Sequence, residues 1–155
     1  MSEWQVRAVK YADRNQRKRF DRFIVDDNHE APHPMDYYIW VLSRGDETIL
    51  VDTGYDEEEG RRRGRPVTLD PLAALAPLGI SAETVSTVIV THLHYDHAGG
   101  NSLAPDVPVI VQSRELDHAR RAGLPFGYVA EDFETGQSFT TVDGEHDLFG
   151  VGSVV

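Results

Sequence analysis

The sequence contains no cysteine among its 155 residues. Disulfide bonds, thiolate nucleophiles and sulfur ligands are therefore excluded, so any metal site must use nitrogen and oxygen donors. Long hydrophobic runs are also missing, because no run approaches the roughly 18 residues that cross a bilayer. The first residues lack the basic and apolar regions of a signal peptide. We therefore expect a cytoplasmic protein that does not act on a membrane.

Positive charge is scarce as well. The chain has 15 basic against 26 acidic residues, which gives a formal net charge of −11. Such a charge repels phosphate backbones and anionic lipid surfaces. Nucleic acid is therefore not expected as a partner.

The length and the 40% hydrophobic content predict one domain over residues 1–155. Runs rich in β-branched and aromatic residues alternate with polar or helix-forming segments. The expected strands are residues 4–11, 37–43, 48–52, 85–91 and 107–111. Asp70 and Pro71 are typical of a helix start, and leucines recur from Leu72 to a stop near Gly79. This order predicts an α/β layered domain.

Four potential metal ligands follow the fourth expected strand in the run His-Leu-His-Tyr-Asp-His, residues 92–97. Side chains two residues apart in an extended chain point the same way, so His92 and His94 can approach one ion. A tight turn then brings Asp96 and His97 to a second ion. Imidazole and carboxylate donors favour zinc, and also suit iron, cobalt or manganese. The motif therefore predicts a site for two divalent metal ions.

The motif resembles the signature of the metallo-β-lactamase superfamily. The resemblance rests on residues 92–97, on the glycines at 99 and 100, and on Val-Asp-Thr-Gly at 51–54. It is closest to the N-acyl homoserine lactonase-like branch, through residues 34–38, Tyr95 and residues 109–115. The fold that it implies is an αββα sandwich with the metals at the sheet edge between two similar halves.

The resemblance also implies roles for individual residues. His92 and His94 would bind the first metal, Asp96 and His97 the second, with Asp52 behind the ligands. A hydroxide activated by the two metals would open the lactone ring, and Asp96 would deliver a proton to the leaving alkoxide. Met35 and Tyr95 would contact the acyl chain, although ordinary core packing explains them equally well.

The family's remaining metal ligands come from segments downstream of residue 155, so the sandwich is expected to be incomplete. The last residues, 147–155, have the pattern of a turn leading into a strand and stop while still apolar. We therefore expect a chain cut short, binding metal weakly because four side chains shared by two ions give about two each. An uncovered apolar sheet also predicts self-association into a homo-oligomer.

Several functions remain open at this point. The first is hydrolysis of a small-molecule lactone, with N-acyl homoserine lactones as the expected substrates and quorum quenching as the expected role. The same site also suits other esters, thioesters or β-lactams. A catalytically incomplete fragment is the alternative from another class. A nuclease of the superfamily is disfavoured by the net charge and by the lack of a basic stretch beyond residues 61–65.

Overall fold

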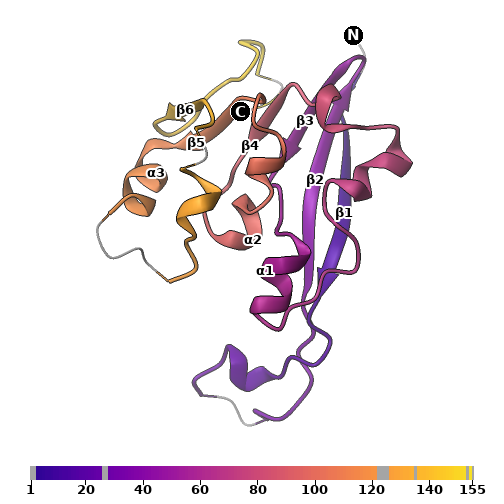
Figure 1. Cartoon of the computed structure of the whole chain (residues 1–155), viewed down its shortest axis with the longest axis vertical. Helices are drawn as coiled ribbons and strands as arrows, with labels where there is room; N and C mark the ends of the chain where they lie inside the picture. The colour runs from indigo at the N-terminus through magenta and orange to yellow at the C-terminus, as the bar shows by residue number, and fades with distance from the viewer. Residues whose placement is uncertain (1–2, 26–27, 122–125, 135, 153, 155) are drawn as a thin grey trace.

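The structure is a computed structural model of the chain, and it describes residues 3–25, 28–121, 126–134, 136–152 and 154. Its centre is a six-stranded sheet with the strands in sequence order from β1 to β6 (Figure 1). The strands are β1 (Gln5–Asp13), β2 (Asp36–Arg44), β3 (Glu47–Val51), β4 (Thr87–Ile89), β5 (Val109–Gln112) and β6 (Phe139–Val142). The first three pair antiparallel, and β3 to β6 pair parallel.

The helices are short. The α-helices are α1 (Glu57–Arg62), α2 (Tyr95–Ala98) and α3 (Ser113–Ala119). The 3₁₀ helices are η1 (Arg19–Asp21), η2 (Ala73–Leu78), η3 (Ala82–Thr84), η4 (Asn101–Leu103) and η5 (Ala130–Asp132). None of the helices in the described ranges combines the length and the apolar character that a membrane crossing requires.

The two faces of the sheet differ. In β2, Tyr37, Ile39 and Val41 are buried, whereas the alternate residues Tyr38 and Trp40 are 40% and 43% exposed. This period of two places one side of the strand against the helices and the other side towards solvent. The described residues therefore form one sheet with helices on one face.

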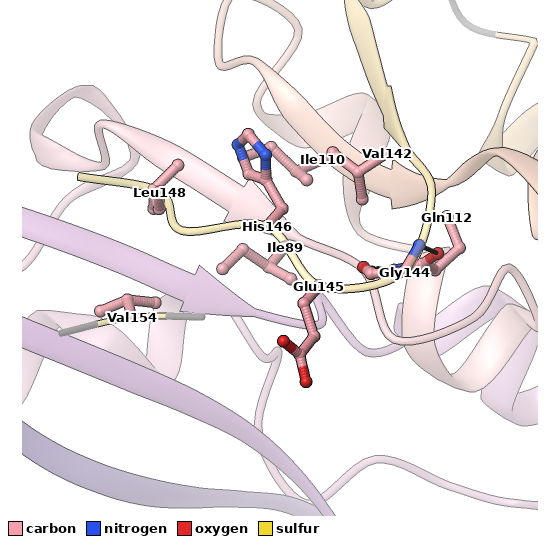
Figure 2. Close-up of a pocket in the computed structure, with 9 residues that line it drawn as sticks. All are labelled: Ile89, Ile110, Gln112, Val142, Gly144, Glu145, His146, Leu148 and Val154. Atoms are coloured by element: carbon pink, nitrogen blue, oxygen red, sulfur yellow. Dashed lines mark hydrogen bonds between the residues drawn. The ribbon is translucent and has the colours of Figure 1, made fainter. Parts of the chain in front are cut away.

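The solvent-facing side of β4, β5 and β6 is partly covered by the segment that follows β6. Ile89, Ile110 and Val142 line a cavity of about 420 Å³ beneath residues 144–148 (Figure 2). The Gln112 amide anchors this segment, because its Nε2 donates to the Gly144 carbonyl at 2.8 Å and its Oε1 accepts from the Gly144 N–H at 3.0 Å. The segment therefore lies across the strands rather than extending the sheet.

The expected strands and the hairpin between β2 and β3 are present, with four differences. Strand β6 was not expected. The fourth strand, expected over residues 85–91, covers only Thr87–Ile89, because η3 precedes it and the loop described below follows it. The helix after Asp70 is a 3₁₀ helix that contains Pro77. The described part of residues 147–155 forms turns instead of a strand, because the Asp147 carboxylate accepts backbone N–H bonds from Phe149 and Gly152.

The capping interactions expected for the 3₁₀ helix are confirmed. Asp70 Oδ1 accepts hydrogen bonds from the backbone N–H groups of Leu72 and Ala73, at 3.0 and 2.9 Å. Gly79 ends the helix in a left-handed conformation with φ of 73°. The two ends of this segment could therefore be placed from sequence, although its helix type could not.

Candidate metal centre

The four predicted ligands lie in one loop and one turn of helix at the end of β4. His92 follows the strand, His94 is the N-cap residue of α2, and Asp96 and His97 are in that helix. Helix α2 has only four residues, and two glycines follow it. A Cβ on Gly99 would lie 2.6 Å from the Tyr95 carbonyl oxygen, and one on Gly100 would lie 2.5 Å from the Thr53 carbonyl oxygen. Glycine at both positions lets α2 pack directly on the backbone that follows β3.

The three imidazoles lie together. The ring centroid of His92 is 4.6 Å from that of His94 and 3.9 Å from that of His97. Burial lowers the pKa of His92, and the neighbouring His97 and His94 lower it further. A low pKa keeps this ring neutral near pH 7, which is the form that binds a metal.

The Asp52 carboxylate fixes this loop through hydrogen bonds to Thr91 and His97. Its carboxylate accepts from the Thr91 N–H at 2.8 Å and from the Thr91 hydroxyl at 2.9 Å, and its Oδ2 lies 2.7 Å from His97 Nδ1. Asp52 is 4% exposed and has φ of 63°, a conformation that costs a non-glycine residue about 1–3 kcal/mol. The hydrogen bonds offset that strain and fix which nitrogen of His97 faces outward.

The outward nitrogen of His97 lies beside Asp96. His97 Nε2 is 3.9 Å from Asp96 Oδ2. Burial lowers the pKa of His97, but the hydrogen bond to Asp52 and the charges of Asp52 and Asp96 outweigh it, so the pKa is raised. Donors about 2.0–2.2 Å from one zinc ion can be up to about 4 Å apart. The separation of these two atoms therefore fits a shared ion.

The four side chains are of types that bind metal ions. A carboxylate behind a histidine is the usual arrangement that orients an imidazole towards a metal. In the described ranges, however, no three His, Asp or Glu side chains gather so that they could hold one ion. The sharing of the four donors between two ions therefore stays a prediction.

Several residues that support the loop could not be recognised from sequence. Glu115 Oε1 accepts from the Leu93 N–H at 2.7 Å and from the Tyr128 hydroxyl at 2.9 Å. The Tyr128 ring meets His94 edge to face with centroids 4.6 Å apart. A Cβ on Gly127 would lie 3.1 Å from the His94 ring. These contacts join residues 13 to 34 positions apart, and no local pattern predicts them.

The two residues predicted to contact an acyl chain lie in the core. Tyr95 is 3% exposed and its ring packs 5.4 Å from that of Tyr55. The Arg63 guanidinium lies 3.9 Å from the centre of the Tyr95 ring, and Arg65 Nη1 is in contact with the Tyr95 hydroxyl. Met35 is partly buried against the same core. Their role in substrate binding stays a prediction.

Comparison with known proteins identifies the family of this chain. The family model described as the metallo-beta-lactamase superfamily matches residues 34–154. An N-acyl homoserine lactonase of a Bacillus species is 28% identical over 130 residues, covering 74% of this chain and 51% of the relative. The N-acyl homoserine lactonase of Bacillus cereus is 25% identical over 144 residues, covering 83% of this chain and 56% of the relative. The chain thus spans about half the length of these curated relatives.

A solved structure shares the fold. The crystal structure of a quorum-quenching N-acyl homoserine lactone lactonase superposes with a TM-score of 0.73 at 20% identity, covering 95% of this chain and 59% of the other. At that identity the likeness concerns the fold alone. Together with the family match over residues 34–154, it shows that this chain belongs to the metallo-beta-lactamase superfamily.

Proposed function

We propose that this chain carries the first half of the active site of a metal-dependent hydrolase that opens lactone rings. The single observation that carries the proposal is the His97 imidazole, fixed through Nδ1 by Asp52 at 2.7 Å with its Nε2 turned towards Asp96. The names of the relatives supply the substrate class, N-acyl homoserine lactones. Opening that ring in a signalling lactone is the chemistry of quorum quenching.

Four residues would hold two divalent ions, with zinc as the favoured metal. His92 and His94 would take one ion, and Asp96 and His97 the other. When bound, the pair would lower the pKa of a water molecule and polarise the substrate carbonyl. Iron, cobalt and manganese suit the same donors.

Side chains of this chain would orient the histidine rings and transfer the proton. Thr91 Oγ1 lies 3.3 Å from Nδ1 of His92 and 3.3 Å from Nδ1 of His97, so one hydroxyl links both rings to Asp52. Asp96 is partly exposed, so its carboxylate could take the proton that the attacking water gives up and pass it to the ring oxygen as the bond between that oxygen and the carbonyl carbon breaks. The hydroxyl group formed stays attached to the product, which is an open-chain hydroxy acid.

A test compares this chain with a version extended by the downstream half of the family fold, each loaded with zinc. Proton release on opening of N-hexanoyl homoserine lactone is measured, with an aryl ester, a thioester and a β-lactam as further substrates. We expect turnover of the lactone by the extended form and far less by the short chain. Preference for another substrate would assign the site to the alternative hydrolase activities, and no turnover by the extended form would leave a non-catalytic protein.

Matched variants identify the catalytic carboxyl group. Asp96→Asn in the extended form should lower the rate of ring opening by about 10²- to 10⁴-fold, the usual contribution of a general acid. Asp106→Asn removes the same charge from an exposed loop and should leave the rate unchanged. Equal rates for the two variants would contradict the role of Asp96.

A further inference from the structure

A second cavity lies between the end of β1 and the segment after α1. It has a volume of about 360 Å³, within the range of small-molecule sites. Its walls include Arg14, Asn15, Gln16 and Arg17 on one side and Gly64 and Pro66 on the other. Asp13, also in the wall, is engaged by Lys10 Nζ at 3.4 Å. The cavity is thus lined by two arginines in a chain whose net charge is −11.

Arg17 is unusual in its surroundings. It is 4% exposed, its Nη1 donates to the His33 carbonyl at a long 3.4 Å, and its Nε is buried with no hydrogen-bond partner. A buried cation without an ion-pair partner is costly in free energy, because burial removes its water and no opposite charge replaces it. In the described ranges, no carboxylate forms an ion pair with Arg17 or Arg14.

Neighbouring charges increase that cost. Burial lowers the pKa of Arg17 most, the positive charges of Arg22 and Arg14 lower it further, and Asp21 and Tyr37 partly oppose them. The charges of Arg22 and Arg14 therefore add to the cost of burying Arg17. An anion in the cavity would supply the missing hydrogen-bond acceptors and the missing charge together.

The charges of Arg14 and Arg17 also act on a buried tyrosine that Asp96 of the metal loop influences. The buried Tyr37 hydroxyl has no hydrogen-bond partner, and it interacts with the charges of Arg14, Arg17 and Arg65 as well as with that of Asp96. The Tyr37 ring packs 5.4 Å from that of Tyr55 in the cluster that contains Tyr95. This cluster reaches the metal loop through Tyr95, the first residue of α2.

We propose that this cavity binds the oxyanion of a small molecule, a carboxylate or a phosphate, between Arg14 and Arg17. Guanidinium groups are suited to this role because their N–H groups match the spacing of two oxygens on one anion. Arg17 and Arg14, which both line the cavity, each contribute a guanidinium group. The site does not depend on the hydrolase activity, since no predicted metal ligand lines it.

Binding is tested by calorimetric titration of the metal-free chain with inorganic phosphate and, separately, with succinate. We expect at least one of the two to bind, and the tighter one identifies the kind of oxyanion. Arg17→Gln and Arg14→Gln should each weaken binding by roughly tenfold or more, the loss of one charge-assisted hydrogen bond. Arg114→Gln removes the same charge from an exposed position on α3 and should leave the affinity unchanged. Equal weakening in all three variants, or no binding of either anion, would overturn the proposal.

A second measurement uses the unaltered chain and so does not depend on the folding of a variant. Phenylglyoxal modifies arginines, and mass spectrometry reads the rate at each position. Saturating phosphate or succinate should slow modification of Arg14 several-fold and leave Arg114 unchanged. Equal rates at Arg14 with and without the anion would contradict an occupied cavity.

Discussion

Asp52→Asn is the substitution that most directly probes how the metal loop is held. The carboxylate accepts hydrogen bonds from the Thr91 N–H, the Thr91 hydroxyl and the His97 ring. An asparagine amide keeps one acceptor oxygen, so either Thr91 or His97 faces an NH₂ group that cannot accept. The variant thus loses one hydrogen bond to a charged group, worth about 1.5–3 kcal/mol.

That loss should appear in metal affinity, because His97 is then free to turn away from Asp96. Removal of such a partner behind a ligand typically weakens metal binding by about 10- to 100-fold. This range corresponds to roughly 1.4–2.7 kcal/mol and agrees with the hydrogen-bond figure. Titration with Co²⁺, followed by the shifts of the amide resonances of residues 91–97 in NMR spectra, measures the dissociation constant even for weak binding.

Asp70→Asn is the matched control. Asp70 also accepts two backbone N–H bonds, at 3.0 and 2.9 Å, but it caps η2, and asparagine caps a helix nearly as well as aspartate. We expect its Co²⁺ affinity to equal that of the unaltered chain. If Asp52→Asn remains folded and binds Co²⁺ as tightly as Asp70→Asn, the reasoning about Asp52 is refuted.

Other predictions concern stability and association. Burial raises the pKa of Asp132 to about 7, with the charge of Glu59 adding to the effect. The unfolded chain loses this proton near pH 4 and the folded chain near pH 7, so Asp132 should reduce stability by about 2–4 kcal/mol as pH rises through that window. Asp132→Asn should abolish this loss in urea unfolding at pH 5 and pH 8, and an unchanged pH dependence would contradict the assignment. Tyr11→Phe removes the hydroxyl that donates to the Asp96 carbonyl at 3.0 Å and should cost about 1–3 kcal/mol in the free energy of unfolding. Tyr37→Phe removes a buried hydroxyl without a partner and should cost nothing, so equal losses in the two variants would count against the Tyr11 bond. The solvent-facing apolar side of the sheet predicts self-association, and a light-scattering mass of 17.4 kDa at high concentration would oppose it.

The features that could be predicted from sequence depend on short-range patterns. His92, His94, Asp96 and His97 lie within six positions, so a strand followed by a tight turn is enough to bring them together. The hairpin of β2 and β3 is likewise local, because two β-rich runs flank a turn that contains Gly45 at φ of 61°. Such short patterns are enough to predict the local backbone geometry.

The features that could not be predicted depend on distant contacts. Glu115 reaches Leu93 only because α3 follows β5, which lies beside β4 in the sheet. The run of charged residues at 57–65 is, by composition, typical of a solvated surface segment with internal ion pairs. Glu59 does pair with Arg62 and Arg63, but Arg65 turns inward to Tyr95. The direction of one long side chain is set by tertiary packing, which neither composition nor periodicity reveals.

X-ray absorption at the zinc edge of the zinc-loaded chain tests the metal centre most directly. We expect nitrogen and oxygen donors at about 2.0–2.2 Å with the back-scattering of imidazole rings, a weaker imidazole signal when His92 and His94 are both replaced by alanine, and its loss when His97 is replaced as well. Zinc surrounded only by water oxygens, or an imidazole signal that survives the double replacement with His97 also changed, would contradict the assignment of these side chains as ligands.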